Sequence, residues 1–258
     1  MKECLVVDLG RIEYGAAWEL QRRVVAARKA GAVPDVLLLC EHPHVVTLGR
    51  NGKLANLRAS HSVLRQRGVS FFETDRGGDI TYHGPGQLVG YPILHLAEIR
   101  RDVAWYLRSL EEAMIRATAE FGVASRRVPG RTGVWVEARA GSAAGDRKEV
   151  NEVEEGKDEE KLAAIGVHLS RWVTSHGFAY NVSTDLRYFD LIVPCGIADK
   201  RATSLEKLLG RSVDFNEVTP RIAAHLGELF GLALTTARRD TLDALLRAHE
   251  GQPVAATA

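Results

Sequence analysis

The pattern of hydrophobic and polar residues predicts many short strands, several of them separated by only a few residues. Such spacing favours antiparallel pairing between strands that follow one another along the chain. The predicted strands are Cys4–Asp8, Val36–Cys40, Val45–Leu48, Val69–Glu73, Ile80–Tyr82, Leu88–Tyr91, Gly133–Val136, Leu162–Val167 and Phe178–Val182.

Other segments repeat their apolar residues every three to four positions, which is typical of amphipathic helices. The predicted helices are Glu13–Lys29, Val103–Phe121, Asn216–Phe230 and Asp240–His249. Strands and helices do not alternate regularly as β-α-β units. We therefore expect an α+β fold, with a mixed and largely antiparallel sheet packed by helices.

Composition narrows the class of protein. The chain has 258 residues, of which 45% are hydrophobic and 26% charged, and this predicts one globular domain spanning residues 1–258. A net charge of +1 argues against a dedicated nucleic-acid binder. No apolar run approaches the roughly 18 residues of a membrane span, and the first residues do not resemble a signal peptide. Three scattered cysteines suit a reducing compartment. We expect a cytoplasmic protein that binds neither nucleic acid nor membrane.

Acidic residues are concentrated between Asp146 and Glu160, where eight acids accompany three bases. With the small residues that precede it, this stretch predicts an exposed loop insertion at about 141–160, joining two strands as a long hairpin connection. Because the insertion carries −5, the rest of the chain carries about +6, a charge that would attract acidic partners. A frayed tail is expected from about residue 250.

A glycine-rich segment from Arg76 to Leu88 is the first candidate site. Glycines there would let the backbone approach a ligand closely, and the paired Gly77 and Gly78 can turn amide groups toward a carbonyl or phosphate. The segment matches neither the dinucleotide fingerprint nor the P-loop. A tight hairpin would explain the glycines equally well, but the polar and aromatic side chains gathered in the same turn favour a binding site.

Cys195 and Lys161 are candidates for nucleophilic chemistry. Cys195 lies between Pro194 and Gly196, where an apolar run ends, although a single cysteine is more often buried and inert. Lys161 opens an otherwise apolar strand. It is either a solvated lysine that ends the acidic loop or a desolvated lysine that serves as a base, and a nearby ammonium would favour the thiolate of a cysteine.

Four histidines stand out, with roles that the sequence leaves open. His83 and His176 each lie in what reads as a glycine-flanked turn, where support of a pocket and catalysis are both reasonable roles. His42 and His44 flank a proline, but two histidines without further cysteine or acidic ligands are a weak zinc signal. We expect no metal site.

Together these segments closely resemble the lipoate-biosynthesis octanoyltransferases, the lipoyl(octanoyl) transferases often called LipB. The similarity runs from about residue 4 to about residue 230, in the family's order and spacing, with a longer acidic insertion than the family pattern. The matching segments are 42–50, 76–87, 161–166, 176–181, 194–196 and 203–205.

The resemblance implies octanoyl transfer from acyl carrier protein to a lysine ε-amine, the first step of endogenous protein lipoylation. The acceptors would be lipoyl domains of 2-oxoacid dehydrogenase complexes and the glycine-cleavage H protein. Cys195 would carry octanoyl as a thioester, and Lys161 would lower the pKa of that cysteine. The implied fold is similar to the catalytic domain of lipoate and biotin protein ligases. The implied substrate contacts are Arg76, Gly77, Gly78, Asp79, Ile80, Thr81, Tyr82, His83, Ala164, Ile165, Gly166, Gly177, Phe178 and Ala179.

The chemistry of such a transfer needs no cofactor, and we expect none. Exchange of a thioester between two thiols is close to isoenergetic, and formation of the amide is downhill. Lys161 can take the Cys195 proton and later a proton from the incoming amine. Backbone amides near Gly77, Gly78 or Gly196 are candidate donors to the tetrahedral oxyanion.

Three other functions remain open. An ATP-dependent lipoate ligase would share the fold but need no cysteine, so Pro194-Cys195-Gly196 argues against it. A thiol hydrolase would pair Cys195 with His83 or His176 and release octanoate to water. A non-catalytic acyl or lipoyl-domain binding protein would require neither Cys195 nor Lys161.

Overall fold

The computed structural model of the chain describes residues 1–138, 159–193 and 201–251. The strands are β1 (Lys2–Arg11), β2 (Asp35–Glu41), β3 (Val45–Leu48), β4 (Ser70–Glu73), β5 (Ile80–His83), β6 (Gln87–Ile93), β7 (Arg126–Val128), β8 (Arg131–Glu137), β9 (Glu159–Ser170), β10 (Val173–Asn181), β11 (Arg201–Ala202) and β12 (Leu232–Thr236). The helices are α1 (Tyr14–Lys29), α2 (His61–Gln66), α3 (Val103–Ala119), α4 (Leu205–Leu209), α5 (Phe215–Phe230) and α6 (Arg239–Glu250), with short 3-10 turns η1 (Leu54–Asn56), η2 (Leu96–Glu98) and η3 (Leu186–Leu191).

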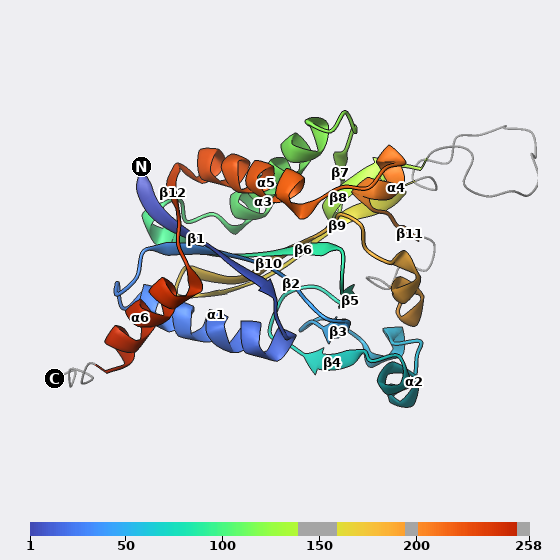
Figure 1. The fold of residues 1–258 in the computed structure, drawn as a ribbon, viewed down its shortest axis with the longest axis horizontal. Helices are drawn as coiled ribbons and strands as arrows, with labels where there is room; N and C mark the ends of the chain where they lie inside the picture. The colour runs from blue at the N-terminus through green and yellow to red at the C-terminus, as the bar shows by residue number, and fades with distance from the viewer. Residues whose placement is uncertain (139–158, 194–200, 252–258) are drawn as a thin grey trace, which may run out of the picture.

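The larger sheet of the described residues has nine strands in the order β12-β1-β2-β6-β10-β9-β8-β7, with β11 paired to β9 (Figure 1). Strand β1 is parallel to β2 and β12, and β11 is parallel to β9. Every other pair in this sheet is antiparallel. A smaller sheet, β4-β3-β5, pairs β3 parallel to β4 and antiparallel to β5. The predicted α+β class with a mixed, largely antiparallel sheet is confirmed.

Helices cover both faces of the larger sheet, with α3 and α5 on one side and α1 and α6 on the other (Figure 1). The alternation of side chains along a strand explains how one apolar strand serves both layers. In β2, Leu37 and Leu39 pack with α3 and α5, whereas Val36 and Leu38 pack with α1 and α6. A third apolar cluster joins the smaller sheet to α2 and η3. The site described below lies between the two sheets.

The four predicted helices are confirmed to within two residues at each end. Short or non-local elements were missed: α2 and α4 have six and five residues, too few for a periodic signal, and β12 pairs with β1 from the far end of the chain. Strand β10 begins at Val173, five residues before the predicted start at Phe178. The sequence Ser175-His176-Gly177 reads as a turn but forms the middle of this strand.

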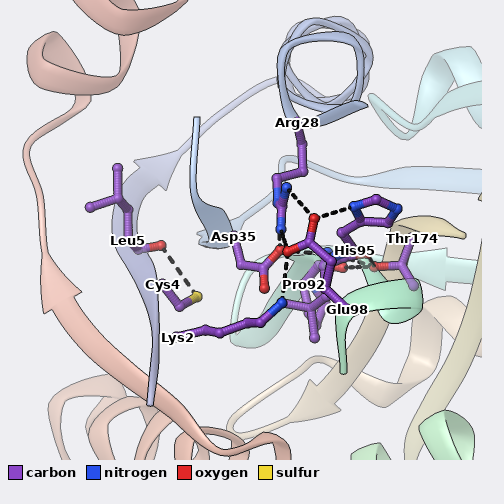
Figure 2. A network of polar contacts seen from close by, with 10 residues as sticks. Lys2, Cys4, Leu5, Arg28, Asp35, Pro92, His95, Glu98 and Thr174 are labelled. Atoms are coloured by element: carbon purple, nitrogen blue, oxygen red, sulfur yellow. Dashed lines mark hydrogen bonds and ion pairs between the residues drawn. The ribbon is translucent and has the colours of Figure 1, made fainter. Parts of the chain in front are cut away.

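A network of charged side chains connects β1, α1, β2 and η2 (Figure 2). The Arg28 guanidinium at the end of α1 donates to the buried Asp35 carboxylate at 2.7 Å and to Glu98 of η2 at 2.8 Å. Asp35 also accepts from the backbone N–H of His95, and Lys2 of β1 pairs with Glu98. Arg28 thus joins α1 to β2 and η2, and β1 is connected to the same network through Glu98.

The predicted acidic insertion lies largely outside the described residues, which resume at Glu159. The predicted hairpin connection is confirmed by the antiparallel pairing of β8 with β9. Glu159 and Glu160, expected in the loop, are buried strand residues: Glu159 pairs with Arg126 and Arg131, and Glu160 accepts from Lys207. The predicted tail from about 250 begins with the end of α6, and residues 252–258 lie outside the described part. Among the described residues, no helix is long and apolar enough to cross a membrane.

Candidate active site

A cavity of about 380 Å³ lies where the smaller sheet meets β9 and β10 of the larger one. Its walls come from the 76–83 segment, from β6, β8, β9 and β10, and from single residues of α1 and α3. The lining residues are Tyr14, Arg76, Gly77, Gly78, Asp79, Ile80, Thr81, His83, Val89, Tyr91, Leu107, Gly130, Arg131, Thr132, Trp135, Lys161, Ala164, Ile165, Gly166, Val167, His176, Gly177, Phe178 and Ala179. The volume and the mixture of apolar walls with a few polar groups are typical of a small-molecule site.

The structure brings nearly all of the predicted substrate contacts together. Segments 76–81, 164–166 and 177–179, which are far apart in the sequence, all line this cavity with His83 and Lys161. The exception is Tyr82, which is fully buried on the other side of β5. Its hydroxyl bonds to His44 Nδ1 at 2.7 Å and its ring stacks on Tyr188, so this side chain supports the loop from behind.

The glycine loop is held by close backbone packing. A Cβ on Gly49 would lie 2.4 Å from the carbonyl oxygen of Gly78, and one on Gly166 would lie 2.8 Å from that of Gly77. The Gly77 N–H donates to the Val167 carbonyl at 2.8 Å. Gly77 is therefore not available as an oxyanion donor, and that expectation is wrong for this residue. Gly196, another candidate donor, lies outside the described residues.

Arg76 acts on the loop itself. Its guanidinium donates from Nη2 to the Thr47 carbonyl at 2.7 Å and to Thr47 Oγ1 at 2.9 Å, and from Nη1 to the Gly77 carbonyl at 3.0 Å. These bonds join the glycine loop to β3 of the smaller sheet. Although Arg76 lines the cavity, its guanidinium donates these hydrogen bonds to protein groups and not into the cavity.

His83 lines the cavity as a neutral acceptor. The Gln87 amide donates to the Tyr82 carbonyl and to Asn181, so its Oε1 must accept, and His83 Nδ1 donates to it at 2.7 Å. Burial lowers the pKa of His83 to about 3. The neutral ring therefore keeps a lone pair on Nε2.

His176 is a strand residue, not a turn residue as predicted, and it has an unusual backbone with φ of +56°. Its N–H donates to Gln21 Oε1 at 2.8 Å, and its Nε2 donates to Asp75 Oδ1 at 2.7 Å. Burial is the main cause of its lowered pKa, whereas the Asp75 carboxylate opposes that shift. Left-handed backbone at a buried, non-glycine residue beside a cavity is typical of functional sites.

His42 supports the cavity wall, and its ring nitrogens bond to other partners than those of His44. The His42 Nδ1 donates to the Ile12 carbonyl, so its Nε2 accepts from the Tyr91 hydroxyl at 2.7 Å. His44 bonds instead to Tyr82. Within residues 1–138, 159–193 and 201–251, no group of three or more potential ligands from His, Cys, Asp and Glu could hold a metal ion.

Because His42 and His83 are buried as neutral rings, we expect the free energy of unfolding to fall as the pH is lowered. Burial lowers the pKa of His42 to about 4 and that of His83 to about 3, against roughly 6.5 in the unfolded chain. Below pH 6.5 the unfolded chain therefore binds protons that the folded chain does not. We expect the free energy of unfolding to fall by roughly 1 kcal/mol per pH unit for each histidine between about pH 6 and pH 4.

Urea unfolding of the wild type and of His42→Gln at several pH values measures this slope. The variant should lose roughly 1 kcal/mol per pH unit of this slope, whereas His61→Gln, at an exposed position, should retain the full slope. An identical slope in wild type and His42→Gln would contradict the assignment of His42 as a buried neutral ring.

Lys161 lines the cavity from β9, opposite Trp135 of β8. Its Nζ lies 4.7 Å from the centre of the Trp135 ring, within the range of a cation–π contact. The Lys161 carbonyl accepts from the N–H of Thr203, and Ala202 of β11 is its register partner. The chain that follows residue 200 is therefore anchored beside Lys161.

The predicted nucleophile Cys195 lies outside the described residues, but the residues flanking that segment are well placed. On the N-terminal side, the Val193 N–H donates to the Asn56 carbonyl, and the Asn56 amide donates to Asp79 at 2.6 Å. Asp79 lines the cavity. On the C-terminal side, Ala202 pairs with Lys161. Both flanks are thus bonded to cavity walls.

Several lining residues were missed from the sequence: most lie on strands and helices that read as ordinary core, and residues 130–132 precede the predicted strand Gly133–Val136. They are Tyr14, Val89, Tyr91, Leu107, Gly130, Arg131, Thr132, Trp135 and Val167. The alternation of side chains along β8 could have identified Trp135 as a lining residue. Trp135 points to the opposite face of β8 from Val134 and Val136, and those two valines belong to the core beneath α3 and α5.

The fold is similar to that of lipoate protein ligases of known structure. A bi-partite lipoate protein ligase from Thermoplasma acidophilum has a TM-score of 0.68 at 16% identity, with 96% of this chain and 92% of that chain covered. A lipoate-protein ligase A bound with ATP has a TM-score of 0.65 at 16% identity, with 96% and 94% covered. At such identities the likeness shows the fold alone.

Sequence comparison places the chain within a family. The family described as the lipoyl protein ligase A/B catalytic domain matches residues 13–227. An octanoyltransferase of Solibacter usitatus is 50% identical, with 89% of this chain and 94% of the relative covered. An octanoyltransferase of Koribacter versatilis is 49% identical, with 87% and 83% covered. The chain belongs to the lipoyl protein ligase A/B catalytic domain family.

Proposed function

We propose that this chain is an octanoyl-[acyl-carrier-protein]:protein N-octanoyltransferase that works through a thioester on Cys195. Octanoyl transfer is the activity for which its relatives at about 50% identity are named. The acyl donor is octanoyl-acyl carrier protein. The acceptors are lysines of lipoyl domains, in 2-oxoacid dehydrogenase complexes and in the glycine-cleavage H protein, and the reaction takes place in the cytoplasm.

One observation carries the proposal: Lys161 lines the cavity, and both flanks of the 194–200 segment are tied to lining residues, Val193 through Asn56 to Asp79 and Ala202 to Lys161. Val193 and Cys195 are two residues apart, so at most about 7 Å of extended chain separates their Cα atoms. Val193 is bonded to Asn56, and Asn56 to the cavity residue Asp79, and this supports the proposal that the nucleophile is supplied by the segment that follows Val193. The geometry favours a nucleophile at that place.

The cavity suits an octanoyl chain. Its apolar surface comes from aliphatic and aromatic side chains on both sheets and on α3, namely Ile80, Val89, Leu107, Trp135, Ile165, Val167 and Phe178. Burial of the acyl chain contributes about 0.8 kcal/mol per CH₂ group.

In the first step, Lys161 accepts the proton of Cys195, and the thiolate attacks the carbonyl carbon of the donor thioester. The carbon–sulfur bond to the carrier breaks as the bond to Cys195 forms. The proton goes to the departing carrier thiolate, which leaves Lys161 neutral.

In the second step, the neutral Lys161 amine removes a proton from the acceptor lysine as that lysine attacks the acyl-Cys195 carbonyl. The thioester bond breaks and the amide forms. The Cys195 thiolate is regenerated beside the Lys161 ammonium. Charge and atoms balance without ATP, since the donor thioester supplies the driving force for amide formation.

A transfer assay separates this function from that of a lipoate ligase. With octanoyl-acyl carrier protein and a lipoyl domain, we expect octanoylation of the acceptor lysine in the absence of ATP, measured as a mass increase of the lipoyl domain. Acceptor modification that appears only with free octanoate and ATP would favour the ligase. Release of octanoate to water, with the acceptor unchanged, would favour the thiol hydrolase.

Replacement of Lys161 tests the proposed base. In Lys161→Ala we expect acylation to slow by about 10²–10⁴-fold, the usual contribution of a general base. The pH profile of Cys195 alkylation should shift to higher pH, because the neighbouring ammonium that favours the thiolate is lost. Stopped assays with octanoyl-acyl carrier protein measure the first effect, and iodoacetamide rates measure the second.

Lys207→Ala is the matched control. The Lys207 ammonium bonds to Glu160, the strand neighbour of Lys161, but Lys207 does not line the cavity. This variant should retain the wild-type alkylation profile. A Lys161→Ala protein with an unchanged profile would contradict the role given to Lys161.

A further inference from the structure

A second cavity, of about 600 Å³, lies between α1 and the β9–β10 hairpin. The residues lining it are Trp18, Gln21, Arg22, Val25, Ala26, Lys29, Ala30, Asp75, His168, Ser170, Arg171 and Ser175. The hydrogen bond between His176 and Asp75 connects it to the 380 Å³ cavity described above, because His176 lines that first cavity and Asp75 lines the second. The mechanism proposed above uses none of the residues that line this second cavity.

Positive charge dominates the lining. Arg22 and Lys29 lie seven residues apart on α1, roughly two turns and so on one face of the helix. Arg171 approaches from the hairpin turn. Arg22 pairs with Glu19, but among the described residues neither Lys29 nor Arg171 has a carboxylate within ion-pair distance. Within the described part of the chain, the hydrogen-bond partner of Lys29 Nζ is the neutral Ser170 hydroxyl, at 2.8 Å.

The carboxylate that lines this cavity does not neutralise these two cations. Asp75 accepts from His176 at 2.7 Å and lies 3.8 Å from His168. Burial and the charge of Arg171 both lower the pKa of Lys29. A like charge close to a partly buried ammonium is unfavourable, and a bound anion would remove that repulsion.

A buried donor in the same cavity lacks an acceptor. Gln21 is 1% exposed, and its Oε1 accepts the His176 N–H. This bond fixes the orientation of the amide, since only the oxygen can accept. The Nε2 group on the other side has no hydrogen-bond partner among the described residues. A buried donor without a partner is destabilising, so an oxygen acceptor supplied by a ligand would be favourable here.

We propose that this second cavity binds a small molecule that bears an oxyanion, a phosphate or a carboxylate, through Lys29, Arg171 and the Gln21 amide. Phosphate and carboxylate share the chemistry that the site recognises: negative charge for the two cations and lone pairs for the amide donor. The inference does not depend on the octanoyl transfer proposed above.

Titration of the purified full-length chain with inorganic phosphate, and in parallel with succinate, tests the site. The melting temperature is followed, with NaCl at matched ionic strength as the reference. We expect a saturable rise with one or both anions, and the stronger of the two identifies the anion class. The half-saturation concentration should increase at least tenfold in Lys29→Gln/Arg171→Gln. In Arg65→Gln, which removes an exposed cation of α2, it should be unchanged.

If the double variant does not fold, two single variants still test the site. Arg171→Gln alters an exposed turn residue, and Gln21→Glu retains an acceptor for the His176 N–H while adding a charge that repels an anion. Both should weaken binding. The same response in all variants, or no response beyond that to NaCl, would overturn the proposal.

Discussion

The Cys195→Ala variant is expected to lose octanoyl transfer by about 10⁴-fold or more. Removal of a covalent nucleophile typically costs this much, because the remaining binding groups cannot form the acyl-enzyme. Steady-state transfer from octanoyl-acyl carrier protein to a lipoyl domain measures the loss. Binding of the donor should persist, since the cavity walls that hold the acyl chain are unchanged.

Cys4→Ala is the matched control for this prediction. Cys4 is buried in the core, and burial is the main cause that raises its pKa to about 12, which keeps it a neutral thiol. Transfer by Cys4→Ala should stay near the wild-type rate. Near-normal transfer by Cys195→Ala would instead exclude a thioester on that residue.

Arg28→Met should lower the free energy of unfolding by about 3–5 kcal/mol. The change removes the guanidinium that bonds to Asp35, and it leaves a buried carboxylate whose Oδ2 already lacks a partner (Figure 2). Breaking a buried ion pair by removing one member typically costs this much, a large share of the 5–15 kcal/mol of a whole domain. Urea unfolding followed by circular dichroism gives the value.

Two further variants separate the buried charge from the rest of the network. Lys2→Gln removes a partly exposed pair with Glu98 and should cost no more than about 1 kcal/mol. Arg28→Met/Asp35→Asn should recover part of the loss, because the isolated carboxylate is gone. A loss below 1 kcal/mol in Arg28→Met alone would show that Asp35 is satisfied without its arginine.

The sequence predicted the helices and most strands because their signals are local. The 103–121 periodicity fixes α3, and the apolar run 36–40 fixes β2. Pairing between distant segments leaves no such signal. Neither the parallel pairing of β12 with β1 nor the separation of β3, β4 and β5 into a second sheet was predicted.

The sequence predicted which segments line the cavity better than it predicted what their individual side chains do there. The glycine-rich segment from Arg76 to Leu88 has a distinctive sequence, and the resemblance to the octanoyltransferases implied the 164–166 and 177–179 segments. Side-chain direction depends on tertiary contacts. Tyr82 faces His44 and Tyr188, Arg76 bonds to Thr47, and His176 lies in a strand. In β5, alternation would have placed Tyr82 opposite Thr81 and His83.

The acyl-enzyme itself tests the central claim most directly. The wild-type protein is mixed with octanoyl-acyl carrier protein, without ATP or acceptor, and its intact mass is measured before and after hydroxylamine. We predict an octanoyl increment that hydroxylamine removes, that maps to Cys195 in a digest, and that passes to an added lipoyl domain. If the acceptor is octanoylated while no increment forms on the enzyme, the transfer does not pass through a thioester on Cys195.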